Sequence, residues 1–182
     1  EMLMTATADG LHCMNCTGDI VITGCVFEAS HDDCMNINGR YLTVKSSEGN
    51  TLTLTGLDVP VFPGDVLEVY SKEDLHMVSS FTVLTVAEDT AGAVTDCFAA
   101  NITQSPTLTV RDCLMGNKRN RGMLIQVRNV TVENCTFRNI CHGPVQIFSV
   151  PSSFGEGIMP AHVSVRNCKF FRCGATDVNI FS

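Results

Sequence analysis

Short runs of alternating apolar and polar residues recur along this chain, punctuated by Asn, Asp and Gly. Four runs share one pattern, in which the alternating residues lead to a polar residue or Gly, then to Cys, then to a large apolar residue two positions later. These runs span residues 20–27, 108–115, 130–137 and 163–170. Period-two alternation rich in Val, Ile and Thr and bounded by turn residues is typical of short strands. Because helical periodicity is absent, we predict an all-β chain.

The four runs are in register with one another. Each Cys is followed by Ile twelve residues later, which links Cys25 with Ile37, Cys113 with Ile125, Cys135 with Ile147 and Cys168 with Ile180. From Cys113 to Cys135 the chain advances 22 residues, about one coil of a right-handed parallel β-helix, in which equivalent positions stack about 4.8 Å apart. We therefore predict such a β-helix, of the pectate-lyase and polygalacturonase type, from residues 1–44 and 107–182, with the four cysteines stacked in its core.

The long gap between the first two repeats has strand-like runs of its own. They include residues 51–54, 66–70 and 81–86, with turn signals at Pro63-Gly64-Asp65 and Glu88-Asp89. Several strands of this kind within a short stretch predict an inserted β-barrel or β-sandwich subdomain over residues 45–106.

Composition limits the partners of the chain. The 12 Lys and Arg against 19 Asp and Glu give a net charge of −7, which disfavours nucleic acid and anionic membrane surfaces. No apolar run approaches the roughly 18 residues of a transmembrane helix. The repeat assigns at least four of the ten cysteines to a stacked core, and Cys13-Met-Asn-Cys16 lacks a matching second pair for zinc. We expect no metal, no cofactor, and a segment of a longer protein, and we leave a homo-oligomer open.

Stacking would also bring polar residues together at one corner. The positions seven and eight residues after each stacked Cys hold Asp32 and Asp33, Asn120 and Arg121, His142 and Gly143, and Ala175 and Thr176. An offset of 24 residues aligns Asp9 with Asp33 and places it in the same row, one coil earlier. We therefore expect Asp9, Asp32, Asp33, Arg121 and His142 to line one surface.

Three clustered acids suggest hydrolytic chemistry. Like charges raise one another's pKa, so we expect one protonated acid beside ionised carboxylates at neutral pH. Glycoside hydrolysis needs that combination, because one group protonates the leaving oxygen and another activates water or attacks the sugar. Each of the five residues alone fits a turn or a surface ion pair equally well. Their coincidence at one corner favours a site in which Arg121 and His142 bind sugar hydroxyls and tune the acids.

Residues 8–12, 18–28 and 32–41, which contain Asp9 and the Asp32-Asp33 pair, resemble the family 110 glycoside hydrolases. These are exo-acting α-1,3-galactosidases with a right-handed parallel β-helix and an inserted β-barrel, and residues 121–125 also resemble a family segment. The resemblance implies inverting removal of terminal α-1,3-linked galactose, with Asp32 as general acid and with Asp9 and Asp33 activating the water. The substrate-binding residues in this assignment are Arg121, His142, Asn36 and His12. Asn38 stands where the family pattern usually has His.

Two other functions fit the same pattern. One is a non-catalytic carbohydrate-binding β-helix, in which the acids only cap turns. The other is a β-helical polysaccharide lyase, in which the acids hold Ca²⁺ and Arg121 is the base. We expect an extracellular or periplasmic protein, because glycan-degrading β-helices are usually exported and glycosylation sequons begin at Asn15, Asn101, Asn129 and Asn134.

Overall fold

The structure is a computed structural model that describes residues 6–55, 58–87, 95–149, 155–174 and 178–180. These residues form strands, bridges, bends and turns. Within them there is no helix, and hence none long and apolar enough to cross a membrane. The prediction of an all-β chain is confirmed.

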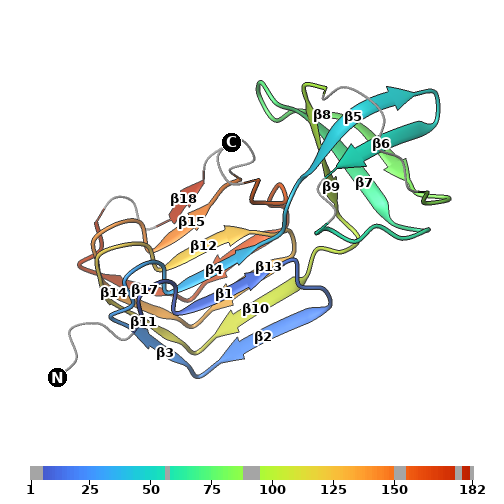
Figure 1. Cartoon of the computed structure of the whole chain (residues 1–182). Helices are drawn as coiled ribbons and strands as arrows, with labels where there is room; N and C mark the ends of the chain where they lie inside the picture. The colour runs from blue at the N-terminus through green and yellow to red at the C-terminus, as the bar shows by residue number, and fades with distance from the viewer. Residues whose placement is uncertain (1–5, 56–57, 88–94, 150–154, 175–177, 181–182) are drawn as a thin grey trace.

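Three sheets are parallel, and the chain visits them in turn (Figure 1). The first parallel sheet has the order β1-β4-β12-β15-β18, the second β2-β10-β13-β16 and the third β3-β11-β14-β17. The strands of the first are β1 (Leu11–Met14), β4 (Met35–Asn38), β12 (Met123–Gln126), β15 (Val145–Ile147) and β18 (Val178–Ile180). Those of the second are β2 (Asp19–Thr23), β10 (Thr107–Arg111), β13 (Val130–Glu133) and β16 (Val163–Arg166). Those of the third are β3 (Val26–Glu28), β11 (Leu114–Lys118), β14 (Thr136–Ile140) and β17 (Lys169–Phe171).

Strand pairing sets the repeats in the register that the sequence indicates. The isoleucines form one row of the first sheet, because Ile37 pairs with Ile125, Ile125 with Ile147 and Ile147 with Ile180. The register of the second sheet likewise aligns the segments that end in Cys25, Cys113, Cys135 and Cys168. All four are free thiols. Stacking of the cysteines, and not disulfide formation, therefore accounts for their spacing.

The residue before each stacked Cys occupies a left-handed corner. Its φ is +64° at Gly24, +56° at Asp112, +54° at Asn134 and +53° at Asn167. Only Gly, and less readily Asn and Asp, adopts this conformation at low energy. The alternation of Gly, Asp and Asn at this position of the repeat is thus the sequence signature of a tight corner between the second and third sheets.

The core lies between the three parallel sheets and is built from the inward residues of each strand. Met35, Ile37, Met115, Ile125 and Phe137 are fully buried there. Burying an apolar side chain of this size stabilises the fold by about 1.5–3 kcal/mol. In the third sheet, Phe170 of β17 stacks on Phe137 of β14 with ring centroids 5.1 Å apart.

A five-stranded antiparallel sheet follows β4 and precedes β10, and lies beside the parallel strands (Figure 1). Its order is β6-β5-β9-β7-β8. The strands are β5 (Leu42–Glu48), β6 (Thr51–Thr55), β7 (Val66–Ser71), β8 (Met77–Thr82) and β9 (Cys97–Asn101). It has an apolar cluster of its own, centred on Leu42, Val44, Val69 and Ala99. Its first strand begins at Leu42, slightly before the boundary expected from the sequence.

Candidate functional site

The three aspartates come from two neighbouring turns that lead into β1 and β4. Asp33 O accepts a hydrogen bond from Gly10 N at 2.9 Å, and Cys34 O accepts one from Leu11 N at 3.0 Å, so the two turns are joined before the strands begin. A Cβ on Gly10 would lie 2.7 Å from Cys34 O. The close approach of the two turns therefore requires glycine beside Asp9.

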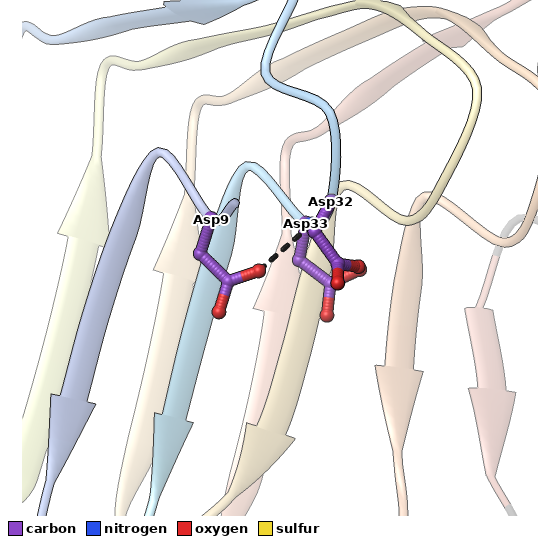
Figure 2. A group of neighbouring side chains, drawn as sticks. All are labelled: Asp9, Asp32 and Asp33. Atoms are coloured by element: carbon purple, nitrogen blue, oxygen red, sulfur yellow. Dashed lines mark hydrogen bonds between the residues drawn. The ribbon is translucent and has the colours of Figure 1, made fainter. Parts of the chain in front are cut away.

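The three carboxylates face one another (Figure 2). One oxygen of each of Asp9, Asp32 and Asp33 lies within 4.8 Å of the others. Asp9 Oδ1 also accepts a hydrogen bond from Asp33 N at 3.0 Å, which fixes the Asp9 side chain against the next turn. The structure thus brings together the three acids that the sequence placed in one row.

Asp33 is the buried member of the cluster. Its side chain is 1% exposed, and its Oδ1 accepts a hydrogen bond from Arg121 Nε at 2.8 Å. Burial raises the pKa of Asp33 because it disfavours the charged form; the Arg121 guanidinium opposes that shift and the Asp32 and Asp9 charges add to it. The ionisation of Asp33 therefore depends on its burial, on Arg121 and on the two neighbouring acids.

Arg121 and Asn120 precede β12, which pairs with β4, and they reach the acids from the turn before that strand. Arg121 O accepts a hydrogen bond from Cys34 N at 3.1 Å, while its guanidinium pairs with Asp33. Asn120 Nδ2 donates to Asp32 Oδ1. The two residues before β12 thus hold the two acids before β4, one side chain to each.

His12 belongs to a chain of polar contacts that ends at Asp9. Asn38 Nδ2 lies 3.0 Å from His12 Nε2, and His12 Nδ1 lies 3.4 Å from Asp9 Oδ2. His12 thus lies between the Asn38 amide and the Asp9 carboxylate, with one ring nitrogen towards each. Asn36 Oδ1 accepts from the same Asn38 amide at 3.2 Å. Asn38, which the sequence analysis did not place in the site, therefore connects His12 and Asn36.

His142 is less closely engaged. The register of the first sheet places it beside Asn120, one strand further from the acids, and it is exposed. Within the described part of the chain, it has no hydrogen bond or ion pair to Asp9, Asp32 or Asp33. Ala175 and Thr176, the next members of the row, lie outside the described residues.

Lys118 and Ser30 are neighbours of the acids that the sequence analysis missed. Lys118 is 6% exposed, and its ammonium donates to Ser30 Oγ at 2.6 Å and to Asp32 O. The repeat contains the signal that could have found it. In the row five residues after the stacked cysteines, Lys118 stands next to Ile140, which is 1% exposed. Lysine is rarely buried unless polar or charged groups pair with it, so a lysine at an inward position indicates such groups nearby.

The acid cluster is close enough for its oxygens to share a cation, but each of the three side chains already has a partner within the chain. Asp9 contacts the Asp33 amide and His12, Asp32 contacts Asn120, and Asp33 contacts Arg121. The Arg121 guanidinium already supplies a positive charge beside the buried Asp33 carboxylate. We assign no metal ion to this group.

Comparison with known proteins gives one consistent set of relatives. An alpha-1,3-galactosidase A of Akkermansia muciniphila is 25% identical over 194 residues, covering 95% of this chain and 33% of that protein. The alpha-1,3-galactosidase A of Bacteroides fragilis is 26% identical over 159 residues, covering 74% of this chain and 26% of its own length. That of Peterkaempfera griseoplana is 25% identical over 203 residues, covering 91% of this chain and 28% of its own length. No family model matches the chain.

These relatives support the family resemblance drawn from the sequence motifs. The chain spans between about a quarter and a third of the length of the curated relatives it matches.

Proposed function

We propose that this chain carries the acid cluster of an exo-acting glycoside hydrolase that removes terminal α-1,3-linked galactose with inversion. The observation that carries the proposal is the convergence of Asp9, Asp32 and Asp33, one of them buried and paired with an arginine. The names of the relatives support the substrate class. The partner in this proposal is therefore a carbohydrate with a terminal α-galactoside.

The proposed roles follow from how each carboxyl is held. Asp32 is the general acid that protonates the leaving glycosidic oxygen, and it is more accessible than the buried Asp33. Asp9 and Asp33 orient and deprotonate the attacking water, with Asp33 kept in place by Arg121. His12, Asn36, Arg121 and His142 are the proposed contacts to sugar hydroxyls.

Inversion rests on the family resemblance. Carboxyl groups of inverting enzymes commonly lie about 6.5–9.5 Å apart and those of retaining enzymes about 5–5.5 Å. The oxygens that approach one another in this cluster lie within 4.8 Å, closer than either pair. The anomer released first, observed by NMR, is therefore the measurement that decides the stereochemistry.

The proposed scaffold is a right-handed parallel β-helix with an inserted subdomain. Residues 1–44 and 107–182 would form the coils, since each strand of the three parallel sheets is followed by one of the next sheet. Residues 45–106 would form a small barrel around the antiparallel sheet. We also propose an extracellular or periplasmic location, as expected of an enzyme that acts on glycans outside the cell.

A lyase is less compatible with the contacts of Arg121. A lyase base must accept a proton, whereas a guanidinium has no acceptor site and Arg121 Nε already donates to Asp33 Oδ1. A non-catalytic carbohydrate-binding protein would place the same acids at turns, and it is separated from a hydrolase by the experiment below.

The test is hydrolysis of a nitrophenyl α-galactoside and of a Galα1,3Gal disaccharide by the intact protein. Asp9→Asn, Asp32→Asn and Asp33→Asn should each abolish release of galactose while the circular-dichroism spectrum stays unchanged. The matched control is Asp112→Asn, because Asp112 occupies the corner that Asn134 and Asn167 occupy in other coils. Retained activity in all three site variants would overturn the proposal, and so would glycan binding by the wild-type protein without hydrolysis.

A further inference from the structure

Lys118 lies behind the turn that carries Asp32 and Asp33. It is the last residue of β11, at an inward position of the third parallel sheet. Its Nζ donates to Ser30 Oγ at 2.6 Å and to the backbone oxygen of Asp32. Ser30 Oγ in turn donates to Asp33 O at 3.1 Å. One ammonium group therefore bonds the Asp32 backbone directly and the Asp33 backbone through Ser30.

Both acceptors of Lys118 are neutral oxygens, so its charge is balanced by groups slightly further away. The charged and titratable groups that face it are Asp33 and Asp9, together with the Cys34 thiol. Burial lowers the pKa of the Lys118 amine, and Cys34, Asp33 and Asp9 counteract that shift by favouring the ammonium form. Transfer of an ammonium group from water to a buried position costs several kcal/mol unless an opposite charge lies close by. The acid cluster supplies that charge.

The three acids of the site therefore have two basic side chains as neighbours. Arg121 pairs with the Asp33 carboxylate, and Lys118 bonds the turn that carries Asp32. Without Lys118, Arg121 would be the one basic side chain among the contacts described above. Like charges at such separations raise one another's pKa strongly.

We propose that Lys118 is a positioning residue that sets the ionisation of the Asp9, Asp32 and Asp33 cluster, by holding the Asp32 backbone and placing a buried positive charge beside the carboxylates. Its catalytic consequence rests on the proposed hydrolase function. Its electrostatic consequence does not, because it concerns the carboxyl groups of the resting protein.

The first experiment titrates the carboxyl groups without substrate. Carbon-13 NMR of the aspartate carboxyls in the intact protein, recorded across pH, should give apparent pKa values for the cluster about one unit higher in Lys118→Gln than in the wild type. The Gln amide keeps a hydrogen-bond donor and removes the charge. Lys118→Arg keeps the charge and should return the pKa values towards those of the wild type.

Lys72→Met is the matched control. Lys72 Nζ also donates to a backbone oxygen, that of Thr95 at 2.6 Å, and lies over the Phe98 ring, but it belongs to the antiparallel sheet. Its substitution should leave the carboxyl titration of the cluster unchanged.

A folded Lys118→Gln protein with wild-type carboxyl titration would overturn the proposal. If Lys118→Gln does not fold, the proposal is tested on the wild-type protein instead. The Lys118 side-chain resonances should shift where the cluster acids titrate, and their constancy there would overturn the proposal.

The second experiment follows catalysis. In Lys118→Gln the whole pH–rate profile for α-galactoside hydrolysis should move to higher pH by about one unit, whereas a purely structural lysine would lower kcat without moving the profile. An unmoved profile would overturn the catalytic role. If the wild-type protein hydrolyses no galactoside, the proposed function fails while the carboxyl titration still tests Lys118.

Discussion

Arg121 and Asp33 are 88 residues apart in sequence and are joined by a hydrogen-bonded ion pair of 2.8 Å between Nε and Oδ1. Asp33 is 1% exposed and Arg121 is 25% exposed, so the carboxylate is buried and the guanidinium covers it towards solvent. A partly desolvated pair of this kind depends strongly on both partners, because a buried charge left alone is costly. The pair therefore links the geometry of the turn before β12 to the ionisation of the acid in the turn before β4.

We predict that Arg121→Met raises the pKa of Asp33 further and lowers kcat/KM for α-galactosides by about 10²-fold, since a small displacement of a reacting group has that effect. Kinetics across pH would show the limb assigned to the base moving to higher pH. Arg166→Met is the control, because Arg166 pairs with Glu133 at 3.0 Å on the exposed surface. Equal effects of the two substitutions would contradict the prediction.

Because Asp33 is buried, we predict that its contribution to the free energy of unfolding decreases as pH rises. Its pKa is raised in the folded protein, so the folded state binds the proton more tightly than the unfolded state. The free energy of unfolding therefore decreases as pH rises from the ordinary pKa of about 3.9 through the folded pKa. Asp33→Asn should be at least as stable as the wild type at neutral pH, and the difference should vanish below the ordinary pKa. Thermal denaturation at several pH values measures this, and a variant that is less stable only at neutral pH would contradict it.

A second left-handed corner predicts a stabilising substitution. Ala29, Asn117, Asn139 and Arg172 share a φ between +51° and +57°, and Asn139 Nδ2 donates to Asn117 Oδ1 at 2.7 Å. Alanine is strained in this conformation by about 1–2 kcal/mol, whereas Asn tolerates it. Ala29→Asn should raise the free energy of unfolding by about 0.5–1 kcal/mol, and Asn139→Ala should lower it by a similar amount. Urea denaturation tests both, and the expected signs are opposite.

Thiol reactivity should separate the cysteines by position. Cys34, Cys113 and Cys135 are buried, and burial raises the pKa of Cys135 to about 11. Cys141 is exposed. Because the thiolate is the reactive form, alkylation at pH 8 should modify Cys141 first and the three buried thiols only after unfolding. Mass spectrometry of the peptides gives the order, and early labelling of Cys135 would contradict its place in the core.

The register of the parallel sheets could be predicted because the repeat is periodic. A constant distance between Cys and Ile fixes which residues become neighbours, and the structure accordingly pairs Ile37 with Ile125 and Ile125 with Ile147. The same arithmetic placed Asp9 beside Asp33, where a hydrogen bond joins them. Periodic stacking turns sequence offsets directly into spatial neighbours, which few other folds allow.

The other contacts of the site depend on side-chain conformation, which the repeat does not determine. Asn38 reaches His12 across two neighbouring strands, and Lys118 reaches the Asp32 backbone from the third sheet. His142 shares a row with Asn120 and yet is exposed. A row assignment gives the position of a residue and not the direction of its side chain, so these contacts could not be predicted from the repeat alone.

The antiparallel sheet also affects the order in which the chain can fold. β4 and β12 are neighbours, with Ile37 beside Ile125, although the whole inserted sheet separates them in sequence. Within that insertion β5 pairs with β9, and Leu42 lies opposite Ala99. Formation of this pair already brings the two ends of the insertion together. Pairing of β4 with β12 then costs little further loop-closure entropy. The inserted sheet would then hold β4 close to β12, so that these two strands can pair in register before the later strands of the first sheet are added.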